Sequence, residues 1–93
     1  MAVNQFETYQ IAVNSTANTQ ILAARTGRTS IRLIARPKVS QQIIYIGPDN
    51  TLTAVNGYPL PTGVEYIFNT ETAVFAIVDK GAGFLNVLEM WDV

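Results

Sequence analysis

Short runs of alternating residues, each ended by turn formers, recur along this chain and limit what it can fold into. The clearest run is TSIRLIAR at residues 29–36, in which Ile31, Leu33 and Ala35 alternate with two arginines and an isoleucine. A period of two is typical of a β-strand, and runs this short are poor candidates for stable helices. Their spacing of roughly 8–12 residues favours an all-β sandwich or barrel.

The predicted strands belong to a single domain that spans residues 1–93. At this length a fold buries roughly 60–65% of the surface of the extended chain, which is enough for one thin core. We therefore expect a single antiparallel β-sandwich, or a barrel-like sandwich, of seven to eight short strands. The strands are predicted at residues 6–13, 20–25, 29–36, 41–47, 51–55, 64–70, 72–79 and 84–93. Residues 72–79 are apolar on both faces, which predicts a strand buried on both sides.

Residues 45–63, YIGPDNTLTAVNGYPLPTG, hold the densest group of turn formers. GPDN at 47–50 fits a type I turn, so 41–47 and 51–55 are predicted to form a hairpin. Asn56 and Gly57 suit a turn that needs positive φ at both central residues. The prolines that follow, at positions 59 and 61, exclude a central strand and predict an extended edge or crossing segment.

The composition leaves few side chains that can do chemistry. Histidine and cysteine are both absent, so the commonest general base and the thiolate nucleophile are missing. The carboxylates are scattered and are expected to be solvated charges, as acidic side chains usually are; they are Glu7, Asp49, Glu65, Glu71, Asp79, Glu89 and Asp92. We therefore predict that the protein is not an enzyme, and that it has no catalytic residues, no metal and no cofactor.

The net charge and the share of charged residues indicate which kinds of partner the protein binds. The formal net charge is −1, which gives the whole protein no strong attraction to nucleic acid. Charged residues make up 14% of the chain, against about 25% in average proteins. A small domain with few charges is expected to expose uncharged surface, and such surface often contacts a partner. We expect no nucleic acid among its ligands.

The basic residues are less evenly spread, because five of the six lie between Glu7 and Asp49, as Arg25, Arg28, Arg32, Arg36 and Lys38. If the strand at 29–36 begins at residue 28, then Arg28, Arg32 and Arg36 line one face. One interpretation is a basic stripe that docks on an acidic or phosphate surface, which makes these three arginines interface candidates. The favoured interpretation is cross-strand pairing with acids such as Glu65, Glu71 or Asp79.

Four aromatic residues, Tyr45, Tyr58, Tyr66 and Trp91, are able in principle to form a platform for sugar stacking. Tyr45, Tyr66 and Trp91 lie inside strand patterns, which favours core or interface packing. Tyr58 lies in the turn-rich segment, and either an exposed anchor or a cap on the core is compatible with its position. Because prolines stiffen this segment and lower the entropy cost of docking, we predict that Tyr58 and Leu60 contact a neighbouring subunit or a larger surface.

The N-terminal sequence MAVNQFETYQ lacks the basic and apolar segments of a signal peptide. No apolar run approaches the ~20 residues that span a bilayer. These features predict synthesis in the cytoplasm and no membrane partner.

Four motifs resemble those of small structural proteins of tailed bacteriophages. They are an Arg-Thr/Ser-x-Ile strand at 28–31, a Tyr-Ile-Gly strand end at 45–47, an Asn-Gly-Tyr-x-Leu-x-x-Gly turn at 56–63 and a Val-x-Ala-Ile strand at 74–77. The matching segments cover about two-thirds of the chain. The motifs consist of turns and core strands, and none is a catalytic signature. The proteins that they resemble are β-sandwiches that decorate or cement capsids, or that form modules of head and tail fibres.

This resemblance implies a mechanical role. A decoration or cement protein forms a homotrimer or dimer, binds the major capsid protein or another virion protein at the outer capsid surface, and stabilises the shell. Such a protein is made in the host cytoplasm and ends in the virion. The alternative is a receptor- or glycan-binding module of a tail or head fibre. A small enzyme and a barrel-type nucleic-acid binder are weaker alternatives, because the first lacks histidine and cysteine and the second lacks aromatics within its basic segment.

Overall fold

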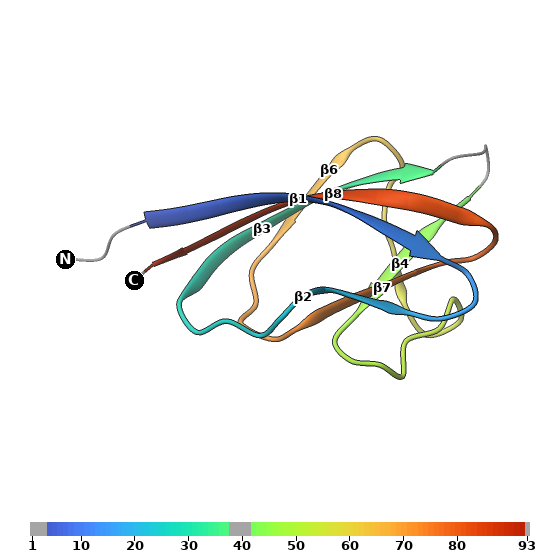
Figure 1. The fold of residues 1–93 in the computed structure, drawn as a ribbon, viewed down its shortest axis with the longest axis horizontal. Coiled ribbons are helices and arrows are strands. Elements are labelled where there is room, and N and C mark those ends of the chain that lie inside the picture. Colours follow the sequence, from blue (N-terminus) through green and yellow to red (C-terminus); the bar gives the residue numbers. More distant parts are fainter. Residues whose placement is uncertain (1–3, 38–41, 93) are drawn as a thin grey trace.

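The chain folds into two antiparallel four-stranded β-sheets that pack face to face, as the computed structural model shows for residues 4–37 and 42–92 (Figure 1). This arrangement confirms the predicted all-β fold and the small β-sandwich. The first sheet has the strand order β1-β8-β3-β6 and the second has the order β2-β7-β4-β5. The strands are β1 (Asn4–Asn14), β2 (Thr19–Leu22), β3 (Arg28–Pro37), β4 (Ile44–Gly47), β5 (Tyr58–Pro59), β6 (Glu65–Phe68), β7 (Val74–Val78) and β8 (Ala82–Asp92).

Alternation along the strands builds the core between the sheets. On β3 the buried apolar residues are Ile31, Leu33 and Ala35, the face that the sequence pattern predicts. Their partners on β8 include Val87 and Leu85, which are also buried. Because side chains on one face of a sheet point the same way, these rows meet the apolar face of the second sheet across the sandwich.

The strand β7 is buried on its core-facing side, as its apolar sequence predicts, and its outward side is only partly covered, because Phe75 is half-buried. Val74, Ala76 and Val78 belong to the core, and Ile77 on the opposite face is only 8% exposed. Because β7 is central in its sheet, between β2 and β4, its outward side chains have neighbouring strands on both sides.

The predicted strand at 51–55 does not form, and β4 pairs with Tyr58 and Pro59 instead. Local hydrogen bonds explain the difference, because the Asn56 carboxamide accepts from Thr53 N–H at 2.7 Å and donates to the Thr51 carbonyl at 3.1 Å. These side-chain bonds hold the backbone in a turn and compete with ladder bonds to β4.

The prediction of positive φ at Gly57 is also wrong. The glycines with positive φ are Gly27, Gly63 and Gly81. A Cβ at Gly57 would lie 2.7 Å from Leu52 Cδ1 and 2.7 Å from Tyr45 Cβ. Glycine is needed at position 57 because buried Leu52 and the Tyr45 stem pack directly against the backbone there.

The segment after β5 crosses from one sheet to the other, as its prolines predict. Leu60 N–H donates to the Ile44 carbonyl of the second sheet, and Gly63 N–H donates to the Ala35 carbonyl of the first. The crossing joins the two sheets at the β5 and β6 edges.

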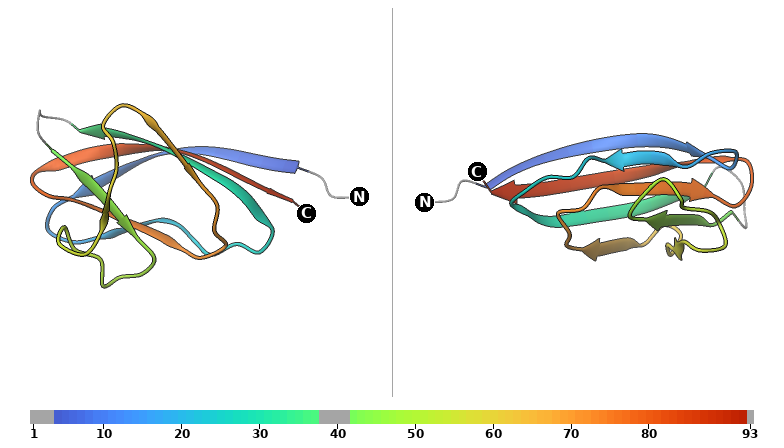
Figure 2. Two further views of the ribbon diagram at one scale, coloured as in Figure 1. Left: turned by 180° about the vertical axis from the view of Figure 1, so that it is seen from behind. Right: turned by 90° about the horizontal axis from the view of Figure 1, so that it is seen from below.

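The opposite edge of the first sheet is formed by β1, which pairs with β8 in one register from Asn4–Asp92 to Asn14–Ala82. Both strands project beyond the second sheet, so the ends of β1 and β8 lie side by side at one end of an elongated molecule (Figures 1 and 2). The molecule measures 45 × 25 × 16 Å along its principal axes. Within residues 4–37 and 42–92 there is no helix of the length and apolar character needed to cross a membrane.

Candidate functional site

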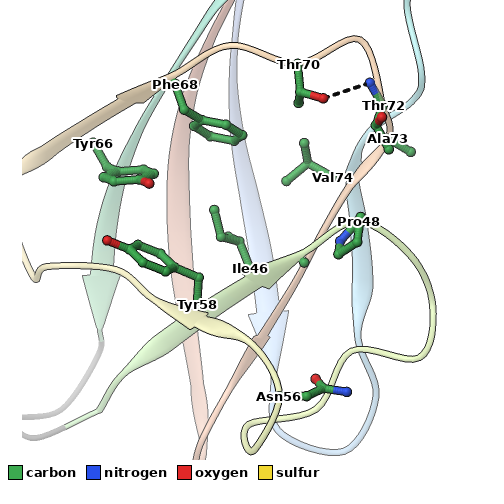
Figure 3. A pocket seen from close by; sticks show the side chains of 11 residues that line it. Ile46, Pro48, Asn56, Tyr58, Tyr66, Phe68, Thr70, Thr72, Ala73 and Val74 are labelled. Atoms are coloured by element: carbon green, nitrogen blue, oxygen red, sulfur yellow. Dashed lines mark hydrogen bonds between the residues drawn. The ribbon is translucent and has the colours of Figure 1, made fainter.

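Three aromatic rings lie in a row at the edge of the sandwich where β5 and β6 face each other (Figure 3). The ring centroids of Tyr58 and Tyr66 are 5.3 Å apart, and those of Tyr66 and Phe68 are 5.5 Å apart. Tyr66 and Phe68 alternate with outward residues along β6, so both turn toward the second sheet. Centroid distances of 4.5–7 Å are those of favourable aromatic pairs.

The row forms one wall of a groove of about 420 Å³ between the two sheets. Ile46 and Val74 form its floor from the second sheet, and the turns after β4 and β6 close one end (Figure 3). The lining residues are Ile46, Gly47, Pro48, Asn56, Tyr58, Tyr66, Phe68, Thr70, Thr72, Ala73 and Val74, none of which is charged.

Several polar groups of the groove already have partners within the protein. Both ends of the Asn56 carboxamide are bonded to the 51–53 backbone, and Thr70 Oγ1 accepts from Thr72 N–H at 3.1 Å. Burial and the adjacent Tyr58 hydroxyl raise the pKa of Tyr66, so the Tyr66 phenol is neutral near pH 7. The groove therefore offers apolar and aromatic surface with few free hydrogen-bonding groups.

Tyr58 and Leu60, the two interface candidates in the turn-rich segment 45–63, have different surroundings in the structure. Tyr58 is 54% exposed and lies at the mouth of the groove, so its ring is available to a partner. Leu60 is 4% exposed and belongs to the core, so the prediction that it contacts a neighbouring subunit is wrong. The reason is the sheet crossing, which turns Leu60 into the sandwich as its N–H bonds to β4.

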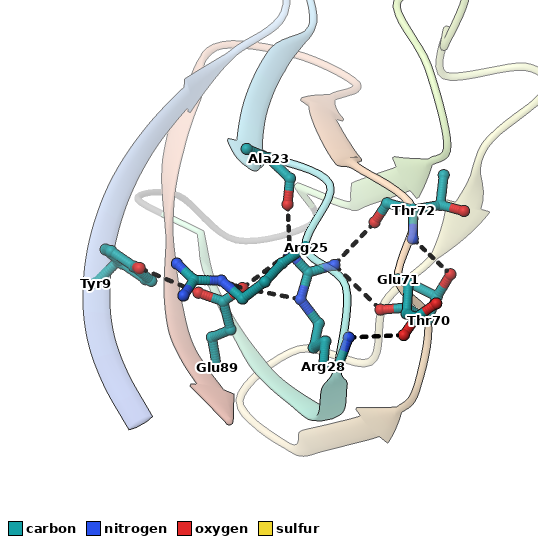
Figure 4. A network of polar contacts seen from close by, with 9 residues as sticks. Tyr9, Ala23, Arg25, Arg28, Thr70, Glu71, Thr72 and Glu89 are labelled. Carbon is teal, nitrogen blue, oxygen red and sulfur yellow. Dashed lines mark hydrogen bonds and ion pairs between the residues drawn. The ribbon is translucent and has the colours of Figure 1, made fainter. Parts of the chain in front are cut away.

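A second cluster of polar residues is buried beside the 70–72 turn, around the Glu89 carboxylate (Figure 4). Glu89 Oε2 lies 2.8 Å from Arg28 Nη2 and 3.0 Å from Arg25 Nε. The side chains of Arg28 and Glu89 are 0% and 2% exposed, and that of Arg25 is 35% exposed. The expectation that the acids are solvated is therefore wrong for Glu89, which is paired with two cations as a buried charge requires.

Arg28 also bonds to the backbone of two loops. Its Nη1 donates to the carbonyls of Thr70 at 3.1 Å and Thr72 at 2.9 Å, and its Nη2 donates to the Ala23 carbonyl. The guanidinium group thus ties the β2–β3 and β6–β7 connections to β8 through Glu89 (Figure 4). Because its donors are used inside the protein, Arg28 acts in the fold and offers nothing to a ligand.

Aromatic side chains complete this cluster. The Tyr9 hydroxyl donates to Glu89 Oε1 at 3.1 Å. Burial, together with hydrogen bonds to Glu7 and Glu89, raises the pKa of Tyr9 to about 12. Arg25 Cζ lies 3.7 Å from the ring centroid of Trp91, within the range of a cation–π contact.

The predicted basic stripe does not form, because a β-bulge interrupts it. The register between β3 and β8 shifts between Arg28 and Ser30, so Arg28 faces the core while Arg32 and Arg36 face outward. Arg32 Nη1 lies 3.8 Å from Glu65 Oε1, which confirms one of the expected cross-strand pairs. Arg36 Nε bonds to Asn86 Oδ1 at 3.0 Å. Lys38 lies outside the described residues.

Of the four aromatic residues considered as a platform, only Tyr58 and Tyr66 come together at the groove. Phe68 joins them without having been singled out, although its position two residues after Tyr66 places it on the same face of β6. Trp91 lies at the arginine cluster, and Tyr45 pairs with Pro59 and Ile77 in the second sheet. In the described part of the chain, no group of three or more acidic, histidine or cysteine residues is arranged to hold a metal ion.

Comparison with models of known protein families and with curated protein sequences found no match for this chain.

Proposed function

We propose that this chain is a virion structural protein that decorates or cements a capsid by binding its outer surface and stabilising the shell. The observation that carries the proposal is the open, uncharged, aromatic groove at the β5 and β6 edges. Such a surface suits apolar side chains of another protein, since aromatic side chains are enriched in the buried centres of interfaces. The four motifs that resemble those of bacteriophage structural proteins indicate the class of partner, which is the major capsid protein or another virion protein.

The same groove bears on the alternative of a glycan-binding module of a tail or head fibre. The stacked Tyr58 and Tyr66 rings favour it, since a sugar face packs on an aromatic ring. A sugar also needs several polar partners, and the Asn56 and Thr70 side chains are already bonded internally. Polar groups of a bound sugar would lose water without replacement, which costs affinity. A protein partner is therefore the better fit.

The test adds purified protein to undecorated particles and measures the bound copies per particle. We expect saturable binding that Tyr58→Ser weakens by about tenfold or more, as loss of a central aromatic anchor does. Val55→Ser is the matched control, because Val55 is 95% exposed on a loop and does not line the groove. Absence of saturable binding would count against decoration, and selective binding to a glycan array would favour the fibre module.

A further inference from the structure

The strands at the edges of the two sheets differ in how well they are protected against pairing with a strand of another chain. β5 has two residues and includes Pro59, β6 has four residues, and β2 has four with an irregular register after Gln20. β1 has eleven residues, lacks proline, and pairs with β8 without a register shift. Short length, proline and bulges are the devices by which native proteins block edge pairing. Among the described strands, β1 is the edge that leaves a long unbroken backbone ladder available.

We propose that two copies of this chain join through antiparallel pairing of their β1 strands, with a two-fold axis beside Tyr9. The two first sheets then form one continuous sheet across the dimer. This proposal rests on the proposed function in one respect, because it names the surface by which a decoration protein would associate with itself. The contact is isologous, so it closes at two copies.

The sequence of β1 fits this register. A two-fold axis at Tyr9 is the one that uses every residue from Asn4 to Asn14, since Tyr9 is the middle residue of the strand. Glu7, the one charged residue of β1, then lies opposite Ile11 of the partner subunit. An axis at Glu7 would instead place two carboxylates opposite each other, which is destabilising.

The exposed Phe6 supplies the apolar contact. Phe6 is 68% exposed and pairs with Met90 across β1 and β8 on the outer face of the first sheet. In the proposed register it lies opposite Ala12 of the partner subunit, which in turn pairs with Phe84 of β8. Aromatic residues reach both opposite and diagonal neighbours across strands. The dimer would therefore cover an apolar side chain that the isolated subunit leaves in water.

The register is tested by cross-linking, for which the absence of cysteine in the natural chain is an advantage. Thr8 lies opposite Gln10 of the partner subunit, and both side chains are exposed in the single subunit. An equimolar mixture of Thr8→Cys and Gln10→Cys proteins should form disulfide dimers faster than either variant alone. Equal rates for the mixture and the separate variants would overturn the register.

Lysines introduced on β1 test whether this edge strand forms the contact between the two copies. Thr8→Lys/Gln10→Lys places like charges opposite each other across the axis, and we expect the dissociation constant of the dimer to rise about tenfold or more. Val55→Lys/Val64→Lys is the control, because it adds the same charge at exposed positions away from β1. Sedimentation velocity over a range of concentrations measures the dissociation constant of the dimer for both double variants. A chain that is monomeric throughout, or a dimer that the first pair of substitutions leaves unchanged, would overturn the proposal.

Particle binding separates this proposal from the proposed function. An edge-dependent dimer that binds no particle supports β1 pairing and counts against decoration. A monomer that binds particles overturns β1 pairing and leaves decoration standing. If the lysine pair abolishes particle binding of a monomeric chain, β1 accepts a strand from another protein, and the second-copy proposal is overturned.

Discussion

Glu89 is the residue through which two arginines and a tyrosine are held together, and its replacement should be costly. In Glu89→Gln, the Arg28 guanidinium stays buried without a counter-charge, because the Arg28 side chain is 0% exposed. We expect the free energy of unfolding to fall by about 3–5 kcal/mol, as when one partner of a buried ion pair is removed. Urea titration measures the change.

The matched control for this prediction is Glu65→Gln. The Arg32–Glu65 pair is 3.8 Å long and its side chains are 43% and 44% exposed, so the substitution should cost less than about 1 kcal/mol. Equal effects of the two substitutions would contradict the assignment of Glu89 as a structural centre.

Tyr9 makes the free energy of unfolding change with pH in the alkaline range. Its pKa is raised from 10.0 to about 12 in the folded protein, so the folded state holds the phenolic proton more tightly than the unfolded state does. The stabilisation from this group is fully present below pH 10 and is lost as the pH rises through 12. We expect the advantage of the natural protein over Tyr9→Phe in unfolding free energy to shrink across this window. An advantage that does not change with pH would show that Tyr9 is not linked to folding.

The residues of the candidate sites were only partly predictable. Tyr58 could be singled out because it lies among turn formers, and the groove confirms that it is exposed. The inward position of Arg28 follows from a bulge at residues 28–30, and no local pattern marks a bulge in this strand. Glu89 pairs with Arg28 from 61 positions away, and alternation alone does not distinguish a buried acid from an exposed one at the end of a sheet.

At the scale of elements, the connection between β4 and β5 depends on close packing at Gly57. In Gly57→Ala the new methyl group would meet Leu52 and the Tyr45 stem at 2.7 Å. We expect a loss of about 1–3 kcal/mol in unfolding free energy, the usual cost of overpacking. Thermal and urea unfolding measure it, with the position of the Leu52 methyl resonances as a second readout.

Gly63→Ala tests a different reason for needing glycine, which is a positive φ and not close packing. Its φ is +70° and nothing lies within 4 Å of the added Cβ, so backbone strain alone should destabilise it by about 1–2 kcal/mol. In this variant the Leu52 resonances should stay in place. A shift of Leu52 in Gly63→Ala but not in Gly57→Ala would contradict the packing argument.

Seven of the eight predicted strands overlap a strand of the structure, and the eighth, at 51–55, does not form. β1, β3 and β8 lie where the sequence predicts them because apolar residues repeat on one face, and β7 does so because it is an unbroken apolar run. The segment 51–55 has the same local character but lies in a connection, since Thr53 and Asn56 bond to the turn backbone. In a short segment, two or three side-chain hydrogen bonds outweigh β-propensity.

At the scale of the whole molecule, the first and last described strands are partners, so the first sheet is complete only when β1 reaches β8. Asn4 pairs with Asp92, and residues 93, 1, 2 and 3 would make a connection of hairpin length if the ends were joined. A circular permutant with this junction, opened after the exposed Val55, makes the β1–β8 pairing local.

We expect this permutant to keep the same fold, with an unfolding free energy within about 2 kcal/mol of the natural chain, because it retains the paired strands and the core. Its folding rate should rise, since pairing that is local in sequence forms faster than pairing between distant segments. Stopped-flow refolding measures the rate, and a Glu89→Gln version reports whether the ionic cluster still forms. A permutant that folds no faster would show that closure of β1 on β8 is not the slow step of folding.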